Sequence, residues 1–189
     1  LDNQPHINTL MEQEPLFYRG HGQMPFEPLS KSAFSYLSRK KVGRGMASAD
    51  FNNDGLVDLL IVNRDSEVTL LANRSVHSGQ WIGLDLRSHD GGPAPVCTKV
   101  ELYLNGAKLE TRWVTAGTGY LSVNDPRMVI RAGPAVSSNE ILKIYWPTKK
   151  NNEFEIQTID ITNVQKNRYL TVRQDQVDHE LNSVKEKRR

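Results

Sequence analysis

Apolar and polar positions alternate through much of the second half of the chain. The alternation is clearest in Trp81–Arg87, in Lys99–Leu104 and in residues 108–114. Because successive side chains of a β-strand point to opposite faces, each segment predicts a strand with one buried and one solvated face. The dipeptide Asn105-Gly106 between the last two segments is the strongest short signal for a hairpin. The pattern predicts antiparallel strands in a small β-sandwich or barrel-like domain.

Short strands are also expected elsewhere in the chain. In the first half, the apolar run at residues 59–62 contains β-branched residues and predicts a buried strand. A helical turn or a long loop is expected between Ser30 and Lys41. The other segments that predict strands are residues 16–19, 24–27, 68–74, 128–133, 141–147 and 169–172. These elements predict an all-β chain.

A stretch rich in side-chain oxygens precedes the run at 59–62. The oxygens occur at the first, third, fifth and ninth places of a nonapeptide, at Asp50, Asn52, Asp54 and Asp58. A hard divalent cation takes six to eight oxygens at about 2.3–2.6 Å, and Gly55 at the sixth place permits the sharp turn that brings such oxygens together. The spacing therefore predicts a Ca²⁺ site with the side chains of these four residues and the backbone carbonyl of Leu56 as ligands. The alternative is an Asx-rich hairpin without metal, because Asn, Asp and Gly form turns unaided.

The residues after this loop distinguish between calcium motifs. An EF-hand requires a bidentate glutamate at the twelfth loop position and flanking helices, whereas that position is Ile61 in the predicted strand. The segment from Gly43 to Leu59 instead resembles the FG-GAP (VCBS-type) repeat, the blade unit of integrin-like β-propellers. This resemblance implies that the loop joins two strands of a blade and holds calcium. The predicted strand and glycine turn at residues 16–27 are similar to those that close such a blade.

A second group of motifs occurs in a fixed order from residue 81 to residue 173. The motifs are Trp81-Ile82-Gly83-Leu84, Gly117-Thr118-Gly119-Tyr120-Leu121-Ser122, a strand ending in Gly133, Ile144-Tyr145-Trp146-Pro147, Ile161-Thr162-Asn163-Val164 and Tyr169-Leu170-Thr171-Val172. Their order is similar to that of the ASPIC/UnbV domain, which follows FG-GAP repeats in cartilage-acidic-protein-like (CRTAC) proteins. The sequence departs from this family at residues 95–98, Pro-Val-Cys-Thr, where the family has an isoleucine-glycine-alanine turn.

The two resemblances predict how the chain is divided. We expect an irregular lead-in at residues 1–15 and an FG-GAP/VCBS-like propeller blade with the calcium loop at 16–76. An ASPIC/UnbV-like β domain at 81–174 and a polar C-terminal tail at 175–189 follow. Because the chain opens at Leu1 without a leader sequence, its N-terminus is expected to be incomplete, with further FG-GAP blades in the parent chain.

Composition limits the partners. With 24 basic and 22 acidic residues the net charge is +2, which favours no polyanion and predicts no nucleic-acid binding. No apolar run approaches the roughly 20 residues of a membrane helix, so no membrane insertion is expected. Cys97 is the only cysteine, so an intrachain disulfide is impossible, and its apolar and small neighbours predict a buried filler.

No catalytic motif stands out. The sequence lacks a G-x-S-x-G elbow, a His-x-x-x-His pair and a Cys-x-x-Cys. Residues 117–120 lack the third glycine and the lysine of a phosphate loop, so a glycine-permitted bulge beside packed Trp113 and Tyr120 is favoured. For all three tryptophans a core role is favoured over sugar stacking. Asn73-Arg74-Ser75 matches the glycosylation sequon, which matters only in a eukaryotic secretory pathway.

The favoured function is a calcium-binding, non-catalytic binding or scaffold module. It would form the C-terminal part of a larger CRTAC-like protein, extracellular or periplasmic, with an unknown protein or carbohydrate ligand. One alternative is an accessory or catalytic domain in carbohydrate or secondary-metabolite (UnbV-type) biosynthesis. Another is an integrin-like protein-adhesion module, which resemblance of fold alone does not establish.

Overall fold

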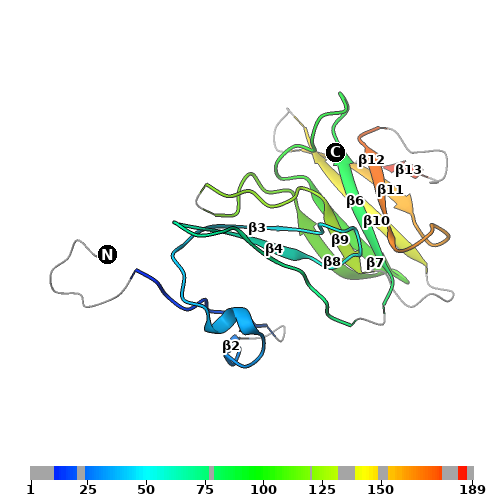
Figure 1. Cartoon of the computed structure of the whole chain (residues 1–189). Coiled ribbons are helices and arrows are strands. Elements are labelled where there is room, and N and C mark those ends of the chain that lie inside the picture. The colour runs from blue at the N-terminus through cyan, green and yellow to red at the C-terminus, as the bar shows by residue number, and fades with distance from the viewer. Residues whose placement is uncertain are drawn as a thin grey trace. The chain divides into compact units, whose positions relative to one another are not determined.

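The structure, a computed structural model, is all-β in its described part except for one short 3₁₀ helix (Figure 1). It describes residues 11–20, 24–76, 79–119, 121–131, 139–148 and 153–175, and the backbone of 183–186. The elements are β1 (Tyr18–Arg19), β2 (Glu27–Pro28), η1 (Ser35–Ser38), β3 (Gly43–Ala49), β4 (Asp58–Asn63), β5 (Thr69–Leu71), β6 (Trp81–Arg87), β7 (Lys99–Leu104), β8 (Ala107–Trp113), β9 (Met128–Arg131), β10 (Glu140–Pro147), β11 (Phe154–Asp160), β12 (Arg168–Arg173) and β13 (Ser183–Glu186).

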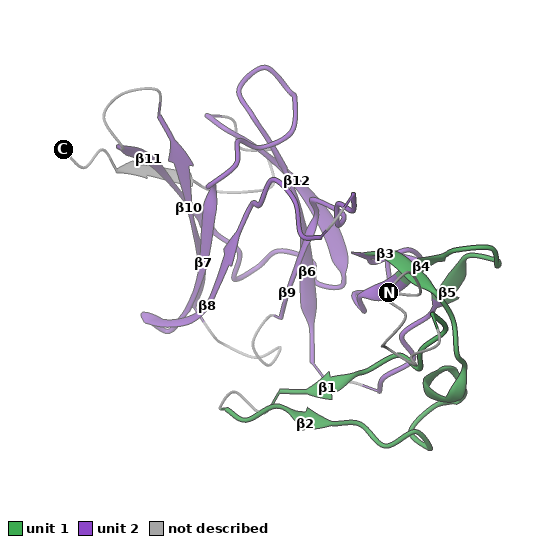
Figure 2. Cartoon of the chain, turned by 90° about the vertical axis from the view of Figure 1, so that its left-hand side faces the viewer, with its two compact units in different colours: residues 1–46, 60–70 green, residues 47–59, 71–189 purple. Residues whose placement is uncertain are grey.

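The chain divides into two compact units (Figure 2). The smaller comprises residues 1–46 and 60–70, and the larger comprises residues 47–59 and 71–189. The predicted calcium loop therefore belongs to the larger unit, together with the region predicted to be ASPIC/UnbV-like. The predicted domain boundaries remain predictions.

The smaller unit contains a short antiparallel pair, β1–β2, and the η1 turn. Tyr36 and Leu37 of η1 are buried, and the rings of Phe17 and Phe34 meet edge to face at a centroid distance of 5.2 Å. Of the two possibilities left open for residues 30–41, the chain thus forms the helical turn.

Strands β3, β4 and β5 form a three-stranded sheet in that order. Strand β4 contains the apolar run predicted to be a strand, and Ile61 within it is buried. A closed propeller requires several blades of four strands each. In the described part of the chain, β3, β4 and β5 form a single sheet of three strands. The propeller-type blade is therefore still a prediction.

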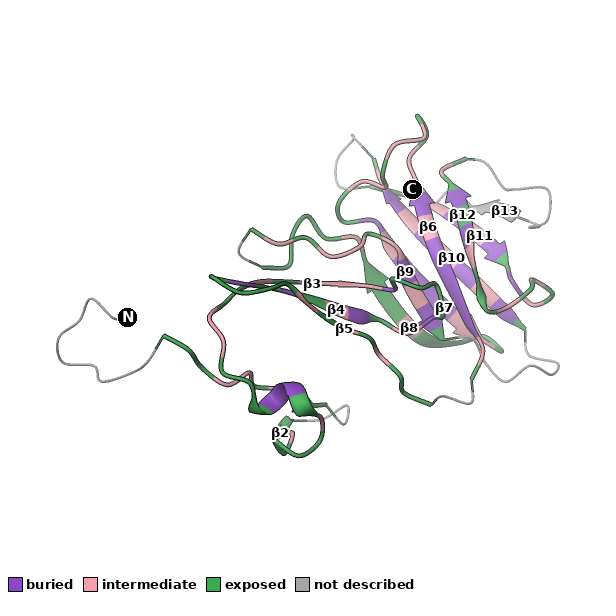
Figure 3. Cartoon of the chain, viewed as in Figure 1, coloured by how far each residue is buried: buried purple, intermediate pink, exposed green. Residues whose placement is uncertain are grey.

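The larger unit contains a β-sandwich. Strands β13-β11-β10-β7-β8 form a five-stranded sheet, and β12-β6-β9 form a three-stranded sheet. Figure 2 shows β11, β10, β7 and β8 of the first sheet and β12, β6 and β9 of the second. Side chains from both sheets meet in one core, and Figure 3 shows the buried residues along β6, β7, β10 and β12. The core comprises Ile82, Leu84, Leu86, Val100, Leu102, Met128, Ile130, Leu142, Ile144, Trp146, Ile159, Ile161, Leu170 and Val172. The sandwich is confirmed, and the described strands form no closed barrel.

The predicted hairpin is confirmed. Strands β7 and β8 pair across Asn105 and Gly106, whose φ angles of 49° and 82° are those of a type I′ turn. Strand β8 lies at the edge of the five-stranded sheet, and most of its side chains are exposed.

One prediction about strand pairing needs correction, and two strands were not predicted. The expectation of purely antiparallel pairing is wrong for β12, which runs parallel to β6, because it enters the sheet after a crossover rather than a hairpin. Strand β11 was not predicted, because its apolar pattern is interrupted by buried Gln157. The Oε1 of Gln157 accepts a 2.8 Å hydrogen bond from Nε1 of buried Trp146, which satisfies both polar groups inside the sandwich. Strand β13 lies within the segment expected to be a polar tail.

Two side-chain predictions also need correction. Cys97 is exposed rather than buried, and it has a φ of 70° in the turn that leads into β7. Its backbone N–H donates to the carbonyl of Val114. Trp81 and Trp146 are core residues as predicted, but Trp113 is 51% exposed because it lies at the end of the edge strand β8. The prediction that Trp113 is packed beside a bulge at residues 117–120 is therefore wrong. Tyr120, the other ring expected to pack there, lies outside the described residues.

Candidate functional site

The predicted calcium loop is a tight turn between β3 and β4 that is organised around a buried carboxylate. Asp50 is only 3% exposed. Its Oδ1 accepts the backbone N–H of Asp54 at 3.0 Å, and its Oδ2 accepts that of Gly55 at 2.8 Å. Gly55 has a φ of +81°, a conformation that favours glycine. Because Gly55 lies five residues after Asp50 and permits a sharp turn, the backbone amides of Asp54 and Gly55 both point towards the Asp50 carboxylate.

The side chains of Asn52 and Asp54 also form hydrogen bonds within the turn. Oδ1 of Asn52 accepts the same Asp54 amide at 3.3 Å, and Nδ2 of Asn52 donates to Oδ2 of Asp54 at 2.7 Å. Oδ1 of Asp54 accepts the N–H of Leu56 at 2.8 Å. The side-chain oxygens of Asp50, Asn52 and Asp54 therefore all bond to backbone or side-chain groups of the loop itself.

Asp58 closes the turn at the start of β4. It is 4% exposed. Its Oδ2 accepts the N–H of Phe51 at 3.0 Å, and its Oδ1 accepts the N–H of Asn73 at 2.7 Å. Asp58 thereby links the beginning of the loop to the chain after β5.

The loop packs against the sandwich through aromatic rings. A Cβ at Gly55 would lie 2.3 Å from the Trp81 indole, so only glycine fits there. The Trp81 ring meets the Tyr169 ring edge to face at 5.5 Å, and the Tyr169 ring covers Gly83. Two glycines, one in the loop and one in β6, thus leave room for a pair of rings between them.

Tyr169 and Arg127 bind the loop by polar contacts. The Tyr169 hydroxyl donates to Oδ2 of Asp50 at 2.8 Å, and burial together with this bond raises the pKa of Tyr169. The Arg127 guanidinium lies 4.4 Å from the Tyr169 ring centroid and donates to Oδ1 of Asn53 and to the carbonyl of Asp50. Asp125 pairs with Arg127 and raises its pKa, so the guanidinium remains charged.

Sequence reasoning found the loop but missed the residues that hold it. Arg127 and Tyr169 are 77 and 119 residues from Asp50, and no local pattern distinguishes them from other arginines and tyrosines. The motif Tyr169-Leu170-Thr171-Val172 did mark the strand that carries Tyr169. The role of its hydroxyl depends on a contact that only folding creates.

The donor chemistry of the loop fits a hard cation, because carboxylate, amide and backbone oxygens dominate it. Oδ2 of Asp50 accepts two bonds, from the Gly55 amide and the Tyr169 hydroxyl, whereas Oδ1 of Asp50 accepts one N–H and retains a lone pair. The described residues nevertheless contain no group of three or more His, Cys, Asp or Glu side chains arranged to hold a metal ion. The hydrogen bonds described above are equally those of an Asx-rich turn that needs no metal.

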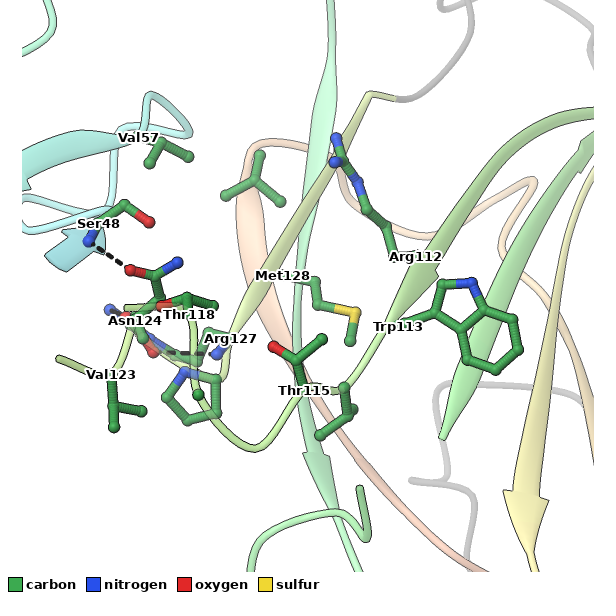
Figure 4. A pocket seen from close by; sticks show the side chains of 15 residues that line it. Ser48, Val57, Arg112, Trp113, Thr115, Thr118, Val123, Asn124, Arg127 and Met128 are labelled. Carbon is green, nitrogen blue, oxygen red and sulfur yellow. Dashed lines mark hydrogen bonds and ion pairs between the residues drawn. The ribbon is translucent and has the colours of Figure 1, made fainter. Parts of the chain in front are cut away.

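The larger unit also has a pocket of about 290 Å³ (Figure 4). It is lined by residues 112–115 after and at the end of β8, by the segment 123–129, and by Ser48 and Val57, among others. Several of its polar groups have structural partners: Oδ1 of Asn124 accepts the Ser48 N–H, Asp125 pairs with Arg127, and Arg112 pairs with Glu110. The described lining contains neither histidine nor cysteine. The pocket is at the lower end of the size range of small-molecule sites and presents no nucleophile–base pair.

The fold and the loop define a β-sandwich protein with an acidic turn anchored to one of its sheets. Residues 93–179 match the sequence profile of the family described as ASPIC and UnbV. The chain therefore contains an ASPIC/UnbV domain, which includes β7 to β12, while β6 precedes the matched range and packs into the same core. A comparison with curated proteins found no match. The described part of the chain has no helix with the length and apolar content that a membrane span requires.

Proposed function

We propose that the chain is a calcium-stabilised, non-catalytic binding or scaffold module, the C-terminal part of a larger CRTAC-like protein. Its predicted Ca²⁺ ligands are Asp50, Asn52, Asp54 and Asp58 through side-chain oxygens and Leu56 through its carbonyl. The module would work outside the cytoplasm, in the extracellular space or the periplasm, where single calcium-binding modules have a Kd of about 10⁻⁴–10⁻³ M.

One observation carries the proposal: oxygens of Asp50 and Asn52 both approach the single backbone amide of Asp54. Two of the predicted ligands thus already converge, and the buried hydrogen bonds of Asp50 hold them there. Because the carboxylates of Asp50, Asp54 and Asp58 repel one another within one short turn, a divalent cation would lower the free energy of the folded loop.

The anchoring of the loop supports a structural role for the cation. Tyr169 and Arg127 bind loop atoms, so ordering the turn also orders contacts to β12 and to the segment before β9. A cation bound only by the folded state stabilises that state by mass action, by about 2.7 kcal/mol at a hundredfold excess over Kd.

The test is calorimetric titration with CaCl₂ and thermal unfolding with about 10 mM Ca²⁺, roughly a hundredfold excess over a Kd of about 10⁻⁴ M. We expect measurable heat and a rise in Tm for the wild type, and neither for Asp54→Ala. Glu153→Ala removes an exposed carboxylate outside the loop and serves as the charge-matched control that keeps the response. If the wild type shows no heat and no shift, or if Asp54→Ala responds as the wild type does, the calcium proposal is wrong.

The two alternative functions are separable by their ligands. An accessory or catalytic role in UnbV-type biosynthesis predicts that a small molecule perturbs NMR signals of the residues lining the 290 Å³ pocket. An integrin-like adhesion role predicts a protein partner whose capture requires calcium and is lost in Asp54→Ala. A calcium response without either result supports the scaffold function.

A further inference from the structure

The outer face of the five-stranded sheet carries a polar and aromatic patch. The register of β8, β7 and β10 places its residues in rows: Trp113, Lys99 and Tyr145 form one row, and Thr111, Glu101 and Lys143 form the next. Tyr103 and Lys108 lie opposite one another in the adjoining row. We call these eight residues the outer-face patch.

A buried carboxylate lies at the centre of the patch. Glu101 is 5% exposed although it faces away from the sandwich core. Its Oε2 accepts the hydroxyls of Tyr103 at 2.9 Å and Tyr145 at 2.8 Å, and its Oε1 pairs with Lys99 at 3.2 Å and Lys108 at 3.6 Å. Four donors from three strands thus fix one another's orientation around a single anion.

This network arranges the surrounding side chains. Lys99 lies 3.8 Å from the centroid of the Tyr145 ring and 5.8 Å from that of Trp113, and Lys143 lies 5.0 Å from that of Tyr103. Both tyrosine hydroxyls donate to Glu101, so their oxygens still have a lone pair with which to accept a bond from a ligand. The patch therefore presents ordered ammonium and phenol groups beside flat rings.

Trp113 is the exposed part of the patch. It is 51% exposed, whereas Trp81 and Trp146 are 4% and 0% exposed. An exposed indole that lies beside ordered polar groups is typical of a binding surface rather than of a core. The CH-rich face of a pyranose ring packs on such a ring, while the sugar hydroxyls bond to its polar neighbours.

Charge and size indicate the ligand. The patch has three lysines and one glutamate, so its net charge is three minus one, or +2. Strands are spaced about 4.8 Å apart, so the row from Trp113 to Tyr145 spans about 10 Å, the length of one to two pyranose rings. The partly exposed Phe154 ring lies beside Tyr145, 6.4 Å between centroids, and adds to the apolar surface at this end of the row. A stable protein interface buries about 800 Å² on each partner, which a row about 10 Å long does not supply.

We propose that the outer-face patch binds a short acidic oligosaccharide, with a pyranose ring stacked on Trp113 and its carboxylate or sulfate groups next to Lys99, Lys108 and Lys143. This inference builds on the proposal that the sandwich is a binding module, and it does not require calcium. It also revises the expectation, drawn from the nearly balanced overall charge, that no polyanion binds.

The test uses oligogalacturonate of four residues as the acidic probe and maltotetraose as the neutral control, titrated into the full chain. Binding is followed by calorimetry and by tryptophan fluorescence, to which exposed Trp113 responds most. We expect the acidic probe to bind more weakly as salt rises, because exposed charges are screened. We expect Trp113→Ala and Lys143→Gln each to weaken binding at least tenfold.

Three controls separate the possible outcomes. Phe51→Ala removes another exposed aromatic ring and keeps the affinity for the sugar. Asp54→Ala also keeps it, so failure of the calcium proposal and failure of this one are distinguishable. The circular dichroism and Tm of Trp113→Ala match those of the wild type, because its indole is half exposed.

Three results would overturn the inference. The first is that the wild type binds neither sugar. The second is that Trp113→Ala binds oligogalacturonate as tightly as the wild type does, which would mean unspecific attraction of anions. The third is that a tetraglutamate peptide competes equally well, which would identify a charge-selective peptide surface instead.

Discussion

Two buried carboxylates of the larger unit differ in the origin of their partners. Asp50 and Glu101 are 3% and 5% exposed, and both are surrounded by hydrogen-bond donors. Asp50 receives two backbone amides from its own loop and one side-chain hydroxyl from a distant strand. Glu101 receives only side-chain donors, from its own strand and from both neighbouring strands.

This difference explains why the sequence alone reveals the Asp50 site, whereas the Glu101 site is recognised only in the folded structure. A carboxylate that bonds to amides four and five residues later follows a local rule, so spacing alone reveals it. A carboxylate that bonds to side chains of adjacent strands depends on register, which spacing along the chain does not encode. The following predictions test this comparison, from the largest expected effect to the smallest.

Asp50→Ala should cause the largest loss of stability. It leaves the amide of Gly55 and the Tyr169 hydroxyl without their acceptor, and the amide of Asp54 keeps only its longer bond to Oδ1 of Asn52. Unpaired buried donors cost about 1–3 kcal/mol each. We expect the free energy of unfolding to fall by about 3 kcal/mol in urea denaturation without added calcium. A loss below about 1 kcal/mol would mean that water replaces these bonds and that the loop is not organised around Asp50.

Glu101→Gln should cost about 2 kcal/mol at neutral pH, because hydrogen bonds to a charged group are lost. Burial raises the pKa of Glu101, but hydrogen bonds from Tyr145, Tyr103 and Lys99 outweigh it and lower the pKa from 4.5 to about 2. Since the folded-state pKa is depressed, the stabilisation is complete above about pH 4.5 and is lost as pH falls towards 2.

The measurement is the difference in unfolding free energy between wild type and Glu101→Gln from pH 7 to pH 2. It should stay constant down to about pH 4.5 and shrink below that value. A difference that does not change with pH would show that the Glu101 carboxylate is not held ionised by its neighbours.

Tyr169→Phe should have a smaller effect, about 1 kcal/mol, because it removes one hydroxyl donor and keeps the ring against Trp81 and Arg127. Amide hydrogen exchange should speed up at Asp54 and Gly55, whose N–H groups bond to the same carboxylate. Unchanged exchange at both amides would show that Asp50 is held by its local bonds alone. Tyr18→Phe, at an exposed tyrosine, is the matched control.

Cys97→Gly should stabilise the protein slightly. Cys97 has a φ of 70°, which costs a side-chain-bearing residue about 1 kcal/mol, and its exposed thiol contributes no packing. Because glycine loses more backbone entropy on folding, the net gain should be only about 0.5 kcal/mol in urea denaturation. Cys97→Ala, which keeps the strain, should not show this gain.

The alternation of residues 81–113 and the Asn105-Gly106 turn predicted β6, β7 and the hairpin correctly, because strand faces and turn angles are local properties. The order of motifs likewise predicted the ASPIC/UnbV domain, and the family match over residues 93–179 confirms it. Strand β11 was not predicted because the buried Gln157 interrupts its apolar pattern. The burial of Gln157 depends on its hydrogen bond with Trp146 in the neighbouring strand.

The sequence by itself determined the all-β class, the sandwich strands other than β11 and β13, and the acidic loop with Gly55 at its turn, since each depends on residues close together in the chain. Only the tertiary structure decided that β12 pairs parallel to β6, that Tyr169 and Arg127 hold the loop, and that Trp113 is exposed beside the Glu101 network. These features join residues far apart in sequence, and strand order and register alone determine which of them meet.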